Sequence, residues 1–145
     1  MTPEQFQREM SSRGFNCSQI VFSYFAPRFG MNMTQALRIS SAFGKGMERG
    51  ATCGVISGAY LVLGLIYGSG DKNTDRTLLK EKLKEFDGEF SKISENRNCT
   101  QILGVDLRNI EQVKEMAIKN PDFMAICPDL VINTIKIIEK IIKES

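Results

Sequence analysis

The chain has 145 residues, of which 42% are hydrophobic and 25% are charged, a composition that suits one globular domain and excludes a disordered chain. Its formal net charge of only +2, without a basic block interleaved with aromatic residues, argues against nucleic acid as a partner. The sequence contains no histidine, which excludes His-based acid–base catalysis, His-ligated zinc or haem, and Ser-His-Asp or Cys-His pairs.

The N-terminal third predicts three helices, because apolar residues recur at three- and four-residue spacings between Gly, Pro and Asn residues. Asn16 is expected to cap the second of them, and Pro27 with Gly30 to end it. The expected helices cover residues 3–13, 17–25 and 33 or 34 to 43.

A glycine-rich stretch that follows, residues 44–70, is predicted to be the centre of the fold. Thr52 caps a helix that starts at Cys53, and this helix is apolar nearly all round, which is typical of a buried helix. Three glycines recur every four residues and line one face, where another backbone or a bound group can approach closely: Gly50, Gly54 and Gly58.

The same stretch is the only candidate for a membrane span. Its glycines, Thr, Ser and Cys make it poorly apolar, so we expect a buried core helix and no membrane partner. The N-terminus is polar and shows no signal peptide, which leads us to expect a cytoplasmic protein.

The C-terminal half predicts four more helices. Thr74 or Asp75 caps a long amphipathic helix that runs to about Ile93, and Asn98 caps a short one. The last helix begins at Cys127, with Pro128 in its first turn. The short helix covers residues 99–103, and a further helix between it and the last one covers residues 107–119. With no run of strand periodicity, we expect an all-α, single-domain multi-helix bundle over residues 1–145, built around the buried glycine-rich helix.

All four cysteines lie in the first turn of a predicted helix. Free N–H groups and the helix dipole favour an anion there, so each thiolate is expected to be stabilised, and thiolate is the form that binds metal or attacks disulfides. Lys45 and Arg49 in the preceding glycine turn could add to this effect at the second cysteine. The four positions are Cys17, Cys53, Cys99 and Cys127.

Three uses of these thiols remain open. The cysteines could converge to hold an iron–sulfur cluster or another thiolate-bound metal for electron transfer with a redox partner, or cycle between dithiol and disulfide. They could form a closed structural zinc site. They could instead be inert core residues of a helical interaction protein. The isoleucine-rich last helix could also pack against a second copy of the chain.

The cysteine segments resemble a known family. The matching pieces are GFNCSQIVFSYFAPRFGM, AFGKGMERGATCGVISGAYLVLGLIYG, EFSKISENRNCTQILGVDL and ICPDLV, which are similar in content and order to the redox-protein family named for its C_GCAxxG_C_C cysteine pattern. In that pattern the four cysteines correspond to Cys17, Cys53, Cys99 and Cys127, and Gly54 and Gly58 correspond to family glycines. Val55 stands where the family usually has Ala. The resemblance implies a redox role through metal, cluster or thiol chemistry.

Overall fold

The computed structural model describes residues 1–144, and this part of the chain folds into eight α-helices joined by turns. β-pairing within it is limited to one antiparallel bridge between Thr52 and Asn98. The predicted all-α, single-domain fold is confirmed. The helices are α1 (Pro3–Ser12), α2 (Cys17–Phe25), α3 (Met33–Ile39), α4 (Gly54–Tyr67), α5 (Thr77–Ile93), α6 (Cys99–Leu103), α7 (Ile110–Lys119) and α8 (Ile126–Lys143).

Short polar side chains set the helix starts, largely as predicted. Asn16 caps α2 by accepting from the Gln19 backbone N–H at 2.9 Å, and Gln19 returns the bond to Asn16 in a complete capping box. Asn98 caps α6 by accepting from the backbone of Thr100 and Gln101. Because these bonds involve residues two or three positions apart, a short sequence pattern is enough to predict them.

Several predicted boundaries differ from the structure. The third helix stops at Ile39, where the Ser40 hydroxyl and backbone N–H both donate to the Ala36 carbonyl, and a 3₁₀ turn follows. The long helix α5 begins at Thr77, where Asp75 accepts from its backbone N–H. The seventh helix begins three residues later than expected, at Ile110.

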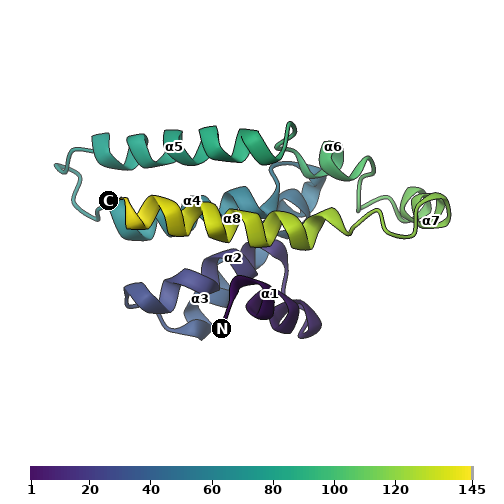
Figure 1. Cartoon of the computed structure of the whole chain (residues 1–145), viewed down its shortest axis with the longest axis horizontal. Coiled ribbons are helices and arrows are strands. Elements are labelled where there is room, and N and C mark those ends of the chain that lie inside the picture. The colour runs from purple at the N-terminus through teal and green to yellow at the C-terminus, as the bar shows by residue number, and fades with distance from the viewer. Residues whose placement is uncertain (145) are drawn as a thin grey trace.

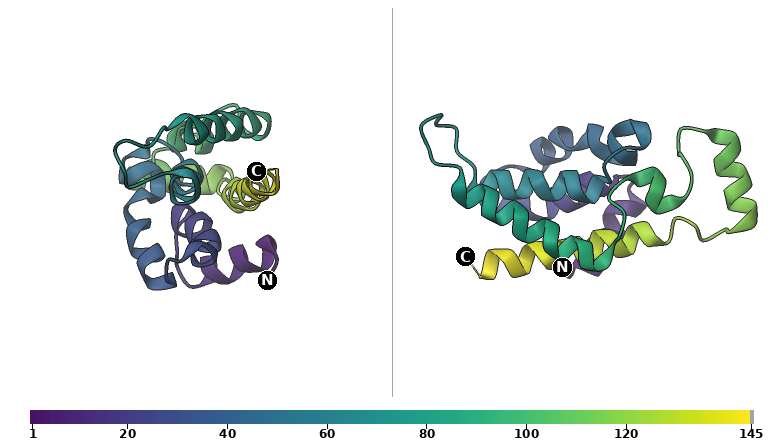
Figure 2. Two further views of the ribbon diagram at one scale, coloured as in Figure 1. Left: turned by 90° about the vertical axis from the view of Figure 1, so that its left-hand side faces the viewer. Right: turned by 90° about the horizontal axis from the view of Figure 1, so that it is seen from above.

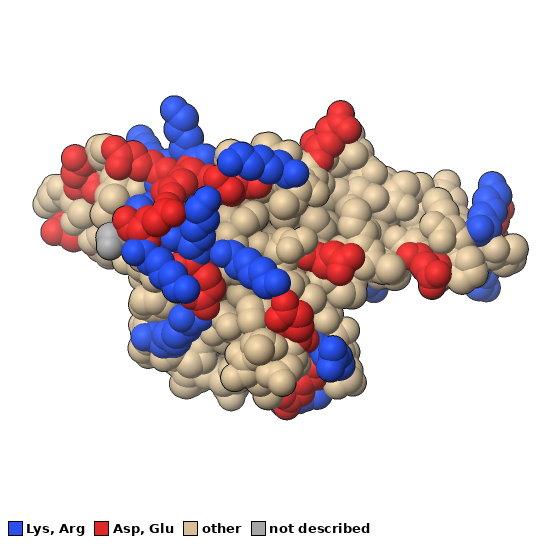
Figure 3. Space-filling view, viewed as in Figure 1, with Lys and Arg blue, Asp and Glu red and all other residues tan. Residues whose placement is uncertain are grey.

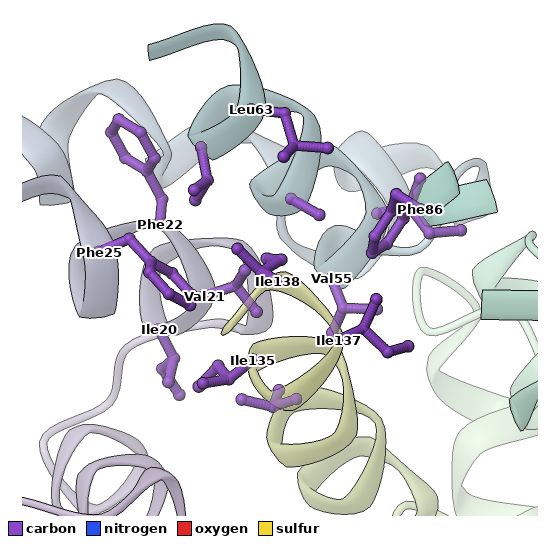
Figure 4. Close-up of a cluster of buried hydrophobic side chains, with 14 of the residues drawn as sticks. Ile20, Val21, Phe22, Phe25, Val55, Leu63, Phe86, Ile135, Ile137 and Ile138 are labelled. Carbon is purple, nitrogen blue, oxygen red and sulfur yellow. The ribbon is translucent and has the colours of Figure 1, made fainter. Parts of the chain in front are cut away.

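The helices pack around α8 and α4. In Figure 1, α5 lies on one side of this pair, and α1, α2 and α3 lie on the other. α8 packs against α1, α2, α4 and α5, and the most extensive helix contact is between α2 and α4. Figure 4 shows the resulting core, to which α2, α4, α5 and α8 all contribute. Its largest fully buried side chains include Phe22, Phe25, Phe86, Phe90, Leu63, Ile135 and Ile138.

Close contact between α2 and α4 depends on two glycines of α4. A Cβ atom on Gly58 would lie 3.0 Å from the Ser18 carbonyl oxygen and 3.1 Å from the Val21 Cβ. A Cβ on Gly54 would lie 3.2 Å from the Ser18 backbone nitrogen. These positions admit the neighbouring backbone, as predicted. Gly50 differs, because it lies in the turn before the helix with φ +69° and not on the glycine face of α4.

The α7 helix stands away from the rest of the molecule, beyond α6 (Figures 1 and 2), and none of its residues is buried. Charged residues gather over α5 and the C-terminal half of α8, whereas the surface near α6 and the start of α8 is mostly uncharged (Figure 3). Among the helices of residues 1–144, none combines the length and the apolar character needed to cross a membrane.

Candidate functional site

The four cysteines line a single cavity of about 280 Å³. Cys17 is the first residue of α2, Cys99 the first of α6 and Cys127 the second of α8, while Cys53 is the N-cap of α4. All four therefore lie at helix N-termini, as predicted, although Cys53 precedes its helix and Thr52 does not cap it. Residues up to 110 positions apart in the chain thus share one site.

A backbone bridge holds two of the thiols on one side. The Cys53 N–H donates to the Arg97 carbonyl at 2.8 Å, and the Cys99 N–H donates to the Ala51 carbonyl at 2.7 Å. These two bonds flank the Thr52–Asn98 bridge. Because successive side chains of an extended segment alternate, Cys53 and Cys99 point to the same side, which is the side of the cavity that both line.

Side chains outside the cavity fix this bridge. Asp87 on α5 accepts from the Arg97 guanidinium at 2.7 Å and from the Tyr60 hydroxyl of α4 at 2.8 Å. The backbone carbonyl of Arg97 in turn accepts the hydrogen bond from the Cys53 N–H. The Thr100 hydroxyl donates to the Gly50 carbonyl at 2.9 Å. Sequence analysis missed Asp87, Arg97 and Thr100, since each has the pattern of an ordinary surface residue and only the fold joins them.

A left-handed turn packs against the bridge. Lys45, Gly46, Met47 and Glu48 have φ values of 53°, 63°, 60° and 57°. A Cβ on Gly46 would lie 2.8 Å from the Cys99 Cβ, so the turn lies directly on this cysteine. The left-handed conformation costs a non-glycine residue about 1–2 kcal/mol. Three such residues among four successive positions make the turn a strained part of the site's wall, held at its end by the Ala51 N–H bond to the Gly46 carbonyl.

Cys17 and Cys127 influence each other more than any other group influences them. Interaction with the Cys17 side chain lowers the pKa of Cys127 below its ordinary value, against the opposing effect of burial. Interaction with the Cys127 side chain, followed by burial and by the nearby cysteine charges, raises the pKa of Cys17 well above its usual range. One thiol of the pair is therefore held protonated while its partner is favoured as the thiolate.

The other two thiols do not behave as predicted. Burial raises the pKa of Cys53 to about 11, even though the backbone of Val55 and Ile56 at the start of α4 acts in the lowering direction. Burial also raises the pKa of Cys99, with a further contribution from the Cys127 charge. The expectation that all four thiolates are stabilised is wrong, since only Cys127 has a lowered pKa. Burial is the largest cause of the raised pKa of Cys53 and of Cys99.

The donor set has the chemistry of a soft-metal site but not its geometry. Four thiols suit zinc, copper or an iron–sulfur cluster. Within residues 1–144, however, no three His, Cys, Asp or Glu side chains are grouped so as to hold one metal ion. Among the four thiols, the strongest mutual influence on pKa is that between Cys17 and Cys127.

The two cations of the glycine turn have different positions. Lys45 lines the cavity, and its side chain also reaches solvent. Arg49 is exposed and does not line it. The pKa shifts of the cysteines are caused by burial, by backbone groups, by one another and by Asp106, so a role of either cation at the thiols stays a prediction.

Comparison with known proteins gives one match. Residues 15–141 match the family model described as "Putative redox-active protein (C_GCAxxG_C_C)". No curated protein and no solved structure matches the chain at a significant level. The matched segment contains all four cysteines of the cavity and nearly the whole helical domain. The chain belongs to the C_GCAxxG_C_C family.

Proposed function

We propose that the protein carries out thiol–disulfide exchange, with Cys17 and Cys127 as the dithiol that is reversibly oxidised. Two observations carry this proposal: both thiols line the same cavity, and each is the largest influence on the pKa of the other. Disulfide formation requires the two Cα atoms to lie within about 7 Å, so a disulfide needs two thiols that share one site. The family's redox description agrees with it.

The two thiols differ in the way that exchange requires. Cys127 is partly exposed and favoured as the thiolate, so it is the attacking sulfur. Cys17 keeps its proton mainly because of the Cys127 sulfur. Once Cys127 is bound in a mixed disulfide it carries no charge, so the main cause of the raised pKa of Cys17 disappears. Cys17 can then lose its proton and attack Cys127 to form the intramolecular bond.

The reduced resting state of such a pair suits the cytoplasmic setting expected from the sequence, where thiols are kept reduced. The reaction needs a second disulfide or dithiol as its redox partner. Cys53 and Cys99 would form the wall of the site, since burial holds both as thiols.

Equilibration in dithiothreitol redox buffers, followed by counting the free thiols, tests this proposal. We expect the wild-type protein to lose two thiols reversibly in one two-electron step. Cys53→Ala and Cys99→Ala keep this step, whereas Cys17→Ala and Cys127→Ala abolish it. Retention of the step in both of the latter variants would show that another pair is responsible.

A second candidate is binding of an iron–sulfur cluster or another thiolate-bound metal, and it is favoured by the convergence of four cysteines on one cavity. All four sulfurs would have to move toward a common centre and lose their protons. Anaerobic purification, metal analysis and a visible spectrum test it. A coloured protein with stoichiometric iron supports the cluster. A colourless protein that unfolds when zinc is chelated indicates a structural site instead.

A further inference from the structure

The cavity is larger and more apolar than a pair of thiols alone requires. Its volume of about 280 Å³ is close to the lower end of the range for small-molecule pockets, roughly 300–1,000 Å³. Apolar side chains from α6, the segments beside α7, and the turn before α2 extend its wall beyond the sulfurs. These include Phe15, Ile102, Leu107 and Met124.

One cationic residue, Lys45, lies beside this apolar wall. Apart from the four cysteines, Lys45 is the only ionisable residue that residues 1–144 contribute to the cavity lining. Its backbone is left-handed, with φ 53° and ψ 37°, a conformation that glycine adopts far more easily. The chain nevertheless has a lysine here, next to Gly46. Strain of this kind at the edge of a pocket is typical of residues that contact a ligand.

We propose that the cavity binds a low-molecular-weight disulfide with an apolar, ring-sized body and an anionic group, the body lying against the apolar wall and the anion pairing with Lys45. This inference rests on the proposed thiol–disulfide exchange and adds its substrate class. The cavity size favours a small molecule over an exposed loop of a folded protein. Within residues 1–144, the one cation in a wall without carboxylates favours an anion over a cationic or uncharged substrate.

In its oxidative half, the exchange needs no reactant besides the protein dithiol and the substrate disulfide. The Cys127 thiolate attacks one substrate sulfur, the substrate S–S bond breaks, and the first half leaves as a thiolate with the electron pair. Cys17 then releases its proton, its sulfur attacks the Cys127 sulfur, and the second half leaves as a thiolate. Two protein thiols are oxidised to one disulfide, and one substrate disulfide is reduced to two thiols that take up the two protons. A dithiol reductant restores the protein.

Stopped-flow kinetics with two aromatic disulfides tests this proposal on the reduced, full-length protein. Dithiobis(nitrobenzoate) is anionic, whereas dithiodipyridine is uncharged at neutral pH. The relevant phase is the one abolished by Cys127→Ala. We expect Lys45→Gln to slow the anionic probe by about fivefold, the upper range for one exposed ion pair, and to leave the uncharged probe unchanged. The difference should vanish near 1 M salt, where the Debye length is about 3 Å.

Two further variants make the test specific. Arg49→Gln removes the same charge from the same turn at a residue outside the cavity lining, and it should leave both rates unchanged. Met124→Glu adds a negative charge at an exposed part of the rim, where Met124 is 43% exposed, and it should slow the anionic probe more than the uncharged one. Equal effects of Lys45→Gln and Arg49→Gln, or no selective effect of Lys45→Gln and Met124→Glu, would overturn the substrate assignment.

Oxidised dithiothreitol separates this outcome from failure of the underlying exchange. It is small and uncharged, so it needs neither Lys45 nor the apolar wall. If it forms the Cys17–Cys127 disulfide while the charge variants show no selectivity, the substrate class is wrong and the exchange stands. If neither it nor the aromatic probes form that disulfide, both proposals are wrong.

Discussion

Replacing Gly58 by alanine should destabilise the protein, although alanine is the better helix former. A Cβ atom at this position lies 3.0 Å from the Ser18 carbonyl oxygen and 3.1 Å from the Val21 Cβ. Overpacking of this kind costs about 1–3 kcal/mol, whereas the change from glycine to alanine within a helix contributes about 1 kcal/mol in the other direction. The expected net change is a loss of stability of up to about 2 kcal/mol.

The same helix provides a matched control. Gly64 also lies within α4, but a Cβ there would meet no atom within 4 Å. Gly64→Ala should therefore raise the free energy of unfolding by about 1 kcal/mol. The two variants should differ by about 1–3 kcal/mol in total, with a difference in Tm of about 2–4 °C for each kcal/mol.

Urea and thermal unfolding of the two variants, followed by far-ultraviolet circular dichroism, measures this difference. If Gly58→Ala proves as stable as Gly64→Ala, α2 and α4 are not packed as closely as the structure describes. Cys17 is the first residue of α2, so that result would also contradict the described placement of Cys17 relative to α4.

Three further outcomes test the turn, the thiol pair and the core. Met47→Gly should raise the free energy of unfolding in urea by about 1 kcal/mol, because Met47 is 45% exposed and its φ of 60° suits glycine. A loss of stability in this variant would contradict the backbone strain of the left-handed turn. Because the pKa of Cys127 is lowered by its interaction with the Cys17 side chain, its alkylation rate should persist below the pH at which ordinary cysteines lose it. Cys17→Ala should move this profile to higher pH by removing that interaction, Cys17→Ser should move it less, and an unchanged profile in Cys17→Ala would refute the interaction. Thr134→Val should stabilise the protein by about 1 kcal/mol in thermal unfolding, since the hydroxyl is buried and has no hydrogen-bond partner among the described residues; a destabilised variant would indicate a partner such as water.

The helix starts were predictable because their signals are local. The two Asn-Cys segments contain both the cap and the residues that bond to it, so Asn16 and Asn98 were identified without knowledge of the fold. The close-packing role of Gly54 and Gly58 followed from their spacing on one helix face. The same spacing misplaced Gly50, because a period of four does not reveal that the chain has a positive φ there.

The chemistry of the site was less predictable because it depends on burial and on distant partners. The helix N-terminal effect was correctly identified, but its outcome at Cys53 is set by desolvation, which a sequence pattern does not contain. The partnership of Cys17 with Cys127 joins α2 to α8 and has no local signal. The bridge that aligns Cys53 with Cys99 likewise requires residues 51–53 to meet residues 97–99 across the fold.

Disulfide mapping after partial oxidation tests the central claim most directly. The reduced protein is treated with one equivalent of hydroxyethyl disulfide, the remaining thiols are alkylated at acidic pH, and the linked peptides are identified by mass spectrometry. Our account predicts a peptide that joins Cys17 to Cys127, with Cys53 and Cys99 alkylated. A dominant link through Cys53 or Cys99, or a statistical mixture of pairs, would contradict it.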